Sequence, residues 1–265
     1  MAVTIGSLRN KMSLISAMSS ESPLYPSDKD AGIAEERSII NNQGVWIVIA
    51  AYNEEKMIAS VVATLRKIYS NIIVVDDGSS DSTFKMAREA KAITLKHPIN
   101  LGQGAALQTG ITYALSKGAE FIVTFDADGQ HCFGDIALLL RALQKTGSDV
   151  ACGSRFLDAQ ASIPSFRKLI LKLAVVFTWI TTGIRMTDAH NGLRAFTGAT
   201  ARKIEIRQNR MAHASEIIEQ IAYNKLKLIE VPVTIIYSEY SLAKGQHMSN
   251  SINILLDLLA NRFAK

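Results

Sequence analysis

The sequence predicts an α/β fold with a mostly parallel central sheet covered by helices on both faces. Short, almost continuously apolar segments such as 45–50 (VWIVIA) and 71–77 (NIIVVDD) are typical of buried parallel strands. Amphipathic helical segments alternate with these strands, as parallel sheets require. The chain has 265 residues, of which 48% are hydrophobic, so it can bury a substantial core.

The first half of the chain alternates predicted strands and helices. The helix that follows the first strand is predicted because Ile58, Val61 and Leu65 recur at the spacing of one helical face. Hydroxyl groups and Asp81 in 79–83 are suited to cap the next helix. In order, we expect a strand at 45–50, a helix at 54–69, a strand at 71–77, a helix from about 79–83, a strand at 92–97, a helix at 104–115, a strand at 120–126, a helix at 135–143 and a strand at 149–155.

The second half has a different pattern. We expect a long amphipathic helix at 163–184, a short strand at 193–196, a helix at 212–223, a strand at 228–237 and an amphipathic C-terminal helix at 252–263. Since no repeat and no Gly/Ser linker separates the halves, residues 44–251 are predicted to form one domain, followed by the C-terminal helix at 252–265. Residues 1–43 lack sustained periodicity and are predicted to be a flexible extension, although 1–20 faintly resemble a targeting presequence.

Composition sets mild limits on function. Lys and Arg total 29 against 24 acidic residues, a small excess that favours phosphates, anionic lipid or nucleic acid without deciding among them. Cys132 and Cys152 form no metal-ligand spacing and suit a reducing cytoplasm. No uncharged apolar run reaches the roughly 20 residues that a membrane-spanning helix needs.

Polar groups follow four of the predicted strands. These stretches are AYNEE (51–55), DDGSSD (76–81), FDADGQH (125–131) and GSR (153–155). Taken alone, the first stretch can be explained by acids at a helix N-terminus, and the second by a turn with a helix cap. Because ligands bind at the carboxyl ends of strands in open parallel sheets, their convergence predicts a binding site there.

FDADGQH places two carboxylates directly after a buried strand. A calcium loop starting at Asp126 would need glycine at its sixth position and glutamate at its twelfth, where the chain has His131 and Ala137. An ordinary Asp-Gly turn remains an alternative. Two acids at this position nevertheless favour a cation, or a metal bound to phosphate, between them.

The stretch NLGQGAALQTG (100–110) is rich in glycine but does not indicate a dinucleotide site. Leu107 stands where the third glycine of that motif belongs, and no G-K-[ST] sequence follows. We attribute these glycines to tight packing of a helix on a strand.

The order of motifs resembles family 2 glycosyltransferases of the Rossmann-like GT-A fold. The similarity runs from about 45 to 246, and it is greatest to the branch that contains dolichyl-phosphate mannosyltransferase and bacterial polysaccharide enzymes. It implies an inverting transferase that moves a sugar from a UDP-, GDP- or dTDP-linked donor, with Mg²⁺ or Mn²⁺, to a polyprenyl phosphate or a polyprenyl-diphosphate-linked glycan, and no nucleic-acid partner. A sugar nucleotidyltransferase and a catalytically silent nucleotide-sugar-binding subunit are the alternatives.

The resemblance also implies roles for individual residues. Asp126 and Asp128 match the DxD motif, with Asp128 the expected direct metal ligand and Asp126 nearer the ribose. Hard oxygen ligands suit either cation. Asp76 or Asp77 is expected to hydrogen-bond the base. The remaining nucleotide-sugar contacts are expected from Ala51, Tyr52, Glu54, Ala127, Gln130 and Arg155.

The chain departs from the family pattern at four places. Gln103 stands where many relatives have lysine, and Cys132 and Phe133 replace the Asp-Pro that commonly follows Gln-His. HNGLRAF replaces SGFRAF, and Lys244 is the expected counterpart of a lysine that relatives carry in another context.

The acceptor determines what chemistry the site needs. A sugar hydroxyl acceptor requires a general base, for which Asp188 is the candidate, with Glu216 behind it. A polyprenyl phosphate is already an anion and needs no base, and Arg167, Arg194 and Lys244 would hold it. Besides Asp188, the residues expected to act in catalysis are Arg155 and Arg194. Structural alternatives are a helix cap or a loop acid for Asp188, a solvated helix face for Arg167, and ordinary polar roles for the histidines at 131, 190 and 213.

Two apolar helical stripes bear on the membrane question. One runs along 163–180 and the other along 252–263, both with lysine or arginine nearby. Core packing, a homo-oligomer seam and a membrane interface are all compatible with such stripes. Given the lipid-linked acceptor that the resemblance implies, we expect a cytoplasmic protein at the inner face of the cytoplasmic membrane.

Overall fold

A computed structural model of the chain describes residues 42–157, 165–210 and 212–236. The chain divides into Met1–Glu36 and Arg37–Lys265, and all described residues belong to the second unit. The expected extension at 1–43, apart from its last two residues, and the expected helix at 252–265 lie outside the described part.

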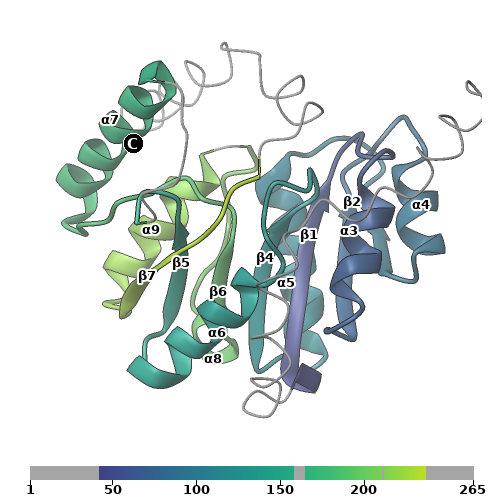
Figure 1. Cartoon of the computed structure of the whole chain (residues 1–265), viewed down its shortest axis with the longest axis horizontal. Coiled ribbons are helices and arrows are strands. Elements are labelled where there is room, and N and C mark those ends of the chain that lie inside the picture. Colours follow the sequence, from purple (N-terminus) through teal and green to yellow (C-terminus); the bar gives the residue numbers. More distant parts are fainter. Residues whose placement is uncertain (1–41, 158–164, 211, 237–265) are drawn as a thin grey trace, which may run out of the picture. The chain divides into compact units, whose positions relative to one another are not determined.

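The centre of the protein is a seven-stranded sheet with the order β3-β2-β1-β4-β6-β5-β7 (Figure 1). Only β6 runs antiparallel to its neighbours β4 and β5; the other strands share one direction, which confirms the mostly parallel sheet. The strands are β1 (Val45–Ala51), β2 (Asn71–Asp76), β3 (Ile93–Lys96), β4 (Phe121–Asp126), β5 (Val150–Ser154), β6 (Arg194–Thr197) and β7 (Leu228–Pro232).

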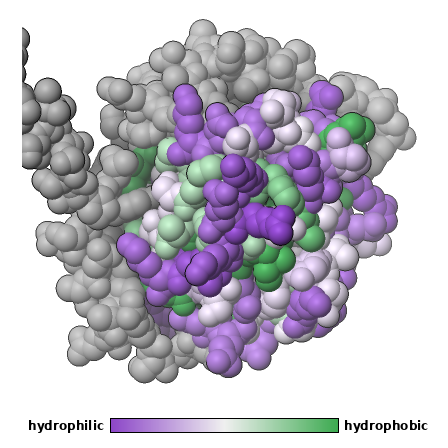
Figure 2. Space-filling model, turned by 90° about the vertical axis from the view of Figure 1, so that its right-hand side faces the viewer, coloured by the Kyte–Doolittle hydropathy of each residue, from purple (hydrophilic) through white to green (hydrophobic). Residues whose placement is uncertain are grey.

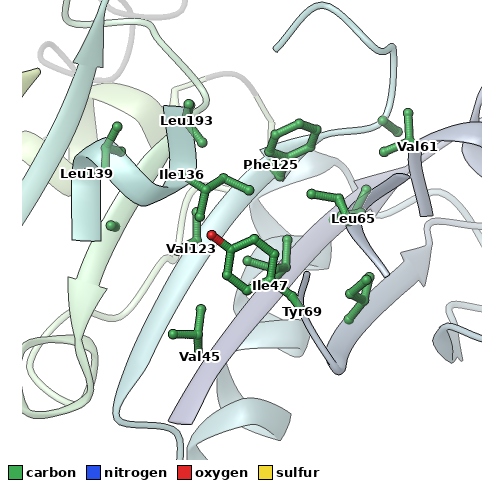
Figure 3. Close-up of a cluster of buried hydrophobic side chains, with 14 of the residues drawn as sticks. Val45, Ile47, Val61, Leu65, Tyr69, Val123, Phe125, Ile136, Leu139 and Leu193 are labelled. Atoms are coloured by element: carbon green, nitrogen blue, oxygen red, sulfur yellow. The ribbon is translucent and has the colours of Figure 1, made fainter. Parts of the chain in front are cut away.

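Helices cover both faces of this sheet. Alternation along β1 explains how: Ile47 and Ile49 belong to the apolar cluster with α3, α4 and α6, while Trp46 and Val48 belong to the cluster with α5, α8 and α9. Figure 3 shows the first cluster, with side chains of α3 and α6 over β1 and β4. The helices are the short 3₁₀ turn η3 (Asn42–Gly44), α3 (Ile58–Leu65), α4 (Thr83–Glu89), α5 (Gln103–Ser116), α6 (Asp135–Thr146), α7 (Ser165–Thr182), α8 (Gly198–Ala201) and α9 (His213–Tyr223).

The last expected strand is shorter than predicted. β7 ends at Pro232, after which the chain crosses to the loop that follows β4. There Thr234 N donates to Asp135 Oδ2 at 2.7 Å, and Ile236 N donates to Gln130 O at 2.8 Å. Val233 N still donates to Ser154 O, and the residues after Val233 support the FDADGQH loop and the start of α6 instead of extending β7.

Helix α7 packs on α9 and exposes one apolar face. Thr178 is buried and Val175 packs against the core, whereas Leu173, Val176 and Ile180 are exposed. Core packing is thus excluded for this part of the predicted stripe. Within the described residues, no helix has the length and apolar character to cross a membrane. The opposite side of the protein, in Figure 2, carries hydrophilic side chains interspersed with smaller hydrophobic areas.

Candidate active site

Three of the four polar stretches meet at one edge of the sheet, as the sequence predicts. Ala51 pairs with Asp76 across β1 and β2, and Ala50 pairs with Asp126 across β1 and β4. AYNEE, DDGSSD and FDADGQH therefore leave adjacent strands side by side. The fourth stretch, after β5, is separated from β4 by β6.

The AYNEE and DDGSSD loops are joined by reciprocal hydrogen bonds. Side chains of the second loop accept from backbone N–H groups of the first, and side chains of the first accept in return. The bonds run from Asn53 N to Ser79 Oγ, Glu54 N to Thr83 Oγ1, Glu55 N to Asp81 Oδ2, Ser80 N to Asn53 Oδ1 and Ser82 N to Glu55 Oε2. Asp81 also accepts from Thr83 N at 2.9 Å and so caps α4. Much of the polar character of both loops thus serves to fix their shape.

Asp76 and Asp77 are not equivalent. Asp77 is buried and fully used: its carboxylate accepts from Leu101 N and Gly102 N and lies 2.7 Å from His97 Nδ1. Asp76 accepts from Ser79 N through Oδ1, while its buried Oδ2 accepts no hydrogen bond from the described residues and lies 3.7 Å from Lys96 Nζ. Of the two expected base-binding residues, Asp76 is the one with an oxygen available.

Asp126 is held by two side chains that the sequence alone does not connect to it. His131 Nε2 lies 2.8 Å from Oδ2, and Gln103 Nε2 donates to Oδ1 at 3.3 Å. Burial alone would raise the pKa of Asp126, yet this pKa is lowered, because the hydrogen bond and charge of His131 act together with the charges of His213 and Arg155. Gly192 lies so close that an added Cβ would collide with both carboxylate oxygens.

Asp128 is the less stabilised carboxylate. Its Oδ1 accepts from Gln130 N at 3.0 Å, and within the described residues Oδ2 accepts no hydrogen bond. Burial and the neighbouring charge of Asp126 raise the pKa of Asp128 to about 6. A cation beside Oδ2 would relieve both effects.

The donor set at this loop fits Mg²⁺ or Mn²⁺ bound together with a ligand. No cluster of three or more His, Cys, Asp or Glu side chains arranged to hold a metal occurs in the described part of the chain. These cations commonly bind through one or two carboxylates and complete their shells with water and substrate phosphates. Asp128, assisted by Asp126 and Gln130, would hold such an ion.

Asp188 and Arg155 form a buried ion pair. Arg155 Nε donates to Asp188 Oδ2 at 2.6 Å, and the side chain of Asp188 is 1% exposed. Glu230 on β7 fixes the same loop, since its carboxylate accepts from Thr187 N and Asp188 N. Glu230 carries no motif and is found only through the fold. Arg155 therefore occupies the Oδ2 oxygen of Asp188.

Arg194 occupies a different place from the one expected. It is buried, and three guanidinium nitrogens donate to backbone carbonyls, those of Asn191, Ala189 and Ala214. This geometry joins the 188–193 loop to α9 and leaves little capacity for a phosphate. The carboxylate of Glu216, the second candidate base, accepts from Arg207 N and Gln208 N.

The other expected contacts have mixed positions. Ala51, Glu54 and Ala127 are buried around the strand ends, and Tyr52 is 45% exposed. Lys244 and the side chain of Arg167 lie outside the described part of the chain, although the backbone of Arg167 belongs to α7.

The glycines of 100–110 allow two different close contacts. Gly110 is the glycine at the predicted helix–strand contact, because an added Cβ would strike Val48 of β1. Gly102 and Gly104 instead lie against the backbone of residues 208–209, and Gly102 has φ +107°, which favours glycine. The strand-packing explanation is wrong for these two positions.

Comparisons with known proteins identify the family. The model of Glycosyl transferase family 2 matches residues 46–203. UDP-N-acetylglucosamine–dolichyl-phosphate N-acetylglucosaminyltransferase of Methanococcus voltae is 36% identical over 83% of this chain and 97% of its own length. Polyprenol monophosphomannose synthase of Mycolicibacterium smegmatis is 26% identical over 83% of this chain and 88% of its own.

A solved structure shares the fold. Glucosyl-3-phosphoglycerate synthase from Mycobacterium tuberculosis, in complex with Mn²⁺, UDP and glucosyl-3-phosphoglycerate, aligns with a TM-score of 0.61 and 16% identity. The alignment covers 91% of this chain and 86% of that one.

Proposed function

The chain belongs to glycosyl transferase family 2, and from that premise we propose that it transfers a sugar from a nucleotide-sugar donor to a polyprenyl phosphate. The observation that carries the donor half is the half-buried Asp126–Asp128 pair, at the edge where β1, β2 and β4 end. Asp76 Oδ2 lies at the end of the adjacent strand and is available to a nucleobase.

A divalent metal belongs to this proposal. Mg²⁺ or Mn²⁺, when bound, would offset the charge that develops on the leaving diphosphate. Asp128 would hold the ion, and His131 and Gln103 would keep Asp126 oriented beside it. The solved neighbour that contains Mn²⁺ and UDP supports this choice.

The acceptor half is supported by the Asp188–Arg155 ion pair. A sugar hydroxyl would need a base, whereas Asp188 is buried and paired. A phosphate oxygen is already an anion and can attack directly, with inversion at the anomeric carbon. The two relatives named for dolichyl-phosphate and polyprenol monophosphomannose chemistry point to the same acceptor class. We also propose that the exposed face of α7 brings the enzyme to the membrane that contains the acceptor.

A screen of nucleotide release tests this function. UDP-, GDP- and dTDP-sugars are offered with Mn²⁺ and a polyprenyl phosphate, starting with UDP-N-acetylglucosamine because of the Methanococcus voltae relative. We expect acceptor-dependent release of a nucleoside diphosphate that Asp128→Asn abolishes. Glu89→Gln on α4, which changes an exposed carboxylate, is the matched control and should retain turnover. Metal-dependent turnover by Asp128→Asn would refute the proposal, and pyrophosphate release from a nucleoside triphosphate and a sugar phosphate would instead indicate a nucleotidyltransferase.

A further inference from the structure

Several buried polar atoms near Asp126 have no hydrogen-bond partner. Within the described residues, buried side-chain atoms of this kind are found on Asp76, His131, His190, Asn191 and Ser215. Folded proteins satisfy nearly all buried polar groups, so a cluster of unsatisfied ones indicates a bound ligand or water. Asp76 belongs to the nucleotide end of the site, whereas the last three residues have no role in the proposed function.

Asn191 and Ser215 come from separate segments that Arg194 joins. Arg194 Nε donates to Asn191 O, and Arg194 Nη1 donates to Ala214 O, next to Ser215 in the first turn of α9. Asn191 is 1% exposed and Ser215 is 6% exposed, yet Asn191 Nδ2 and Ser215 Oγ make no hydrogen bond.

The same segment borders the Asp126 carboxylate. Gly192, adjacent to Asn191, lies against both Asp126 oxygens, and Thr124 Oγ1 donates to Gly192 O at 2.7 Å. The antiparallel pairing of β4 with β6, which matches Thr124 with Arg194, sets this contact. Asn191 therefore directly precedes the glycine that lies against Asp126, the carboxylate that the donor diphosphate and its metal would approach.

The chemistry of these groups favours a neutral ligand. Both ring nitrogens of His190 are buried without a partner, and burial together with the charge of Arg194 lowers the pKa of His190 to about 4. A neutral imidazole offers one donor and one acceptor, an amide NH₂ offers donors, and a hydroxyl offers both. The nearby cations are engaged, Arg155 with Asp188 and Arg194 with carbonyls. Hydroxyl groups of a sugar ring match this set better than a phosphate does.

We propose that His190, Asn191 and Ser215 form the subsite that binds the sugar ring of the donor, beside Asp126. The inference rests on the proposed function, because it assumes a nucleotide-sugar donor whose diphosphate lies at Asp128. It names the residues that would contact the sugar ring and would therefore determine which pattern of hydroxyl groups the enzyme accepts. The nucleotide itself is bound elsewhere, at the ends of β1 and β2.

Two variants separate sugar binding from nucleotide binding. Ser215→Ala removes a hydroxyl that has no partner, and His190→Phe keeps a ring but removes both nitrogens. With Mn²⁺ present, we expect each variant to bind UDP-N-acetylglucosamine about fivefold more weakly, while UDP binding changes less than about twofold. Melting temperatures should stay equal or rise, since no protein hydrogen bond is lost. GDP and GDP-mannose provide the same comparison for the other donor class.

The outcomes are distinct. Equal weakening of UDP and UDP-sugar, or no change in either, would overturn the subsite. A lower melting temperature with unchanged donor affinity would show that these atoms hold only structural water, which also overturns it. If the unmodified protein binds none of these four ligands, nor dTDP or a dTDP-sugar, the proposed function itself fails.

Discussion

His131 Nε2 lies 2.8 Å from Asp126 Oδ2, and its ring packs edge-on against Phe125 with the centroids 5.5 Å apart. The contact connects the last residue of β4 to the loop that follows it, and Phe125, a core residue of β4, packs against the imidazole. Asp126 therefore meets its ligands with a fixed orientation and not as a freely rotating carboxylate.

Replacing His131 should weaken metal binding without removing it. Groups that orient metal ligands typically contribute about 10–100-fold to metal affinity. We expect His131→Phe to raise the Mn²⁺ concentration needed for half-maximal UDP binding by about tenfold, and His131→Gln to restore part of the loss through an amide donor. His97→Gln, which alters the equivalent histidine beside Asp77, is the control and should leave Mn²⁺ dependence unchanged. Unaltered Mn²⁺ dependence in His131→Phe would contradict this role.

The fold is largely readable from the sequence because its signals are local and repeated. Apolar runs such as 45–50 and 71–77 predict β1 and β2, and the spacing of Ile58, Val61 and Leu65 predicts α3. The antiparallel direction of β6 is not readable, because the short stretch LRAF carries no signal of orientation. The early end of β7 depends on Asp135 and Gln130, which are distant in sequence.

The sequence predicts which strand ends form the site, but it does not predict the hydrogen-bond partners of the side chains there. Asp76 ends β2 and Asp77 follows it, and the sequence gives no reason to treat the two carboxylates differently. Hydrogen bonds from Leu101 N and Gly102 N satisfy Asp77, whereas the buried Oδ2 of Asp76 accepts none from the described residues. From the sequence, Arg194 is predicted to bind a phosphate, whereas in the structure its guanidinium donates to backbone carbonyls. Such assignments need long-range contacts that no spacing rule contains.

Substitution of Asp188 distinguishes a positioning residue from a base. Asp188→Asn leaves Arg155 without its buried counter-charge, and breaking a buried pair typically costs about 3–5 kcal/mol of stability. With a polyprenyl phosphate acceptor we expect kcat to fall less than about tenfold, whereas loss of a general base costs about a hundredfold or more. Turnover is measured at a temperature where the variant remains folded by circular dichroism.

A second variant controls for that loss of stability. Asp149→Asn removes a carboxylate that accepts from Lys227 N and Thr200 Oγ1, beyond the opposite end of β5. It should destabilise the protein without affecting catalysis. A hundredfold loss of kcat confined to Asp188→Asn would assign Asp188 to proton removal and favour a hydroxyl acceptor.

Stability should fall with acid because two histidines are buried in the neutral form. Burial lowers the pKa of His213, as it does that of His190, from 6.5 to about 4. The unfolded chain therefore binds more protons between these values, so stability is complete above pH 6.5 and decreases as the pH falls toward 4. Each histidine should contribute on the order of 2 kcal/mol between pH 7 and pH 5.

Urea unfolding of His213→Gln at both pH values isolates one of these contributions. Glutamine can still donate to Arg210 O, the partner of His213 Nδ1, but it does not titrate. The decrease in unfolding free energy from pH 7 to pH 5 should be about 2 kcal/mol smaller than in the unmodified protein. Carboxylates titrate in both proteins and cancel in the comparison. Equal decreases would show that His213 is charged in the folded state.

The exposed face of α7 should bind an anionic membrane. Leu173, Val176, Trp179 and Ile180 are 49%, 48%, 45% and 74% exposed, and the guanidinium of Arg185 lies 5.2 Å from the Trp179 ring centroid. Residues 159–187 contain four basic residues (167, 168, 172 and 185) and no acid. Apolar side chains with adjacent cations and an interfacial tryptophan are typical of helices that lie in the headgroup region.

Ile180→Glu tests this orientation because it places a charge at the most exposed of the four positions. We expect its binding to phosphatidylglycerol vesicles to fall about tenfold, with little binding of either protein to phosphatidylcholine alone. Leu138→Glu, at a 37% exposed leucine of α6 on a separate helix, is the matched control and should bind normally. Nucleotide release with a short, water-soluble polyprenyl phosphate should be equal in all three proteins, since the sheet edge is unchanged. Normal vesicle binding by Ile180→Glu would exclude this face, and a change of mass in solution would identify it as a contact between two copies of the chain.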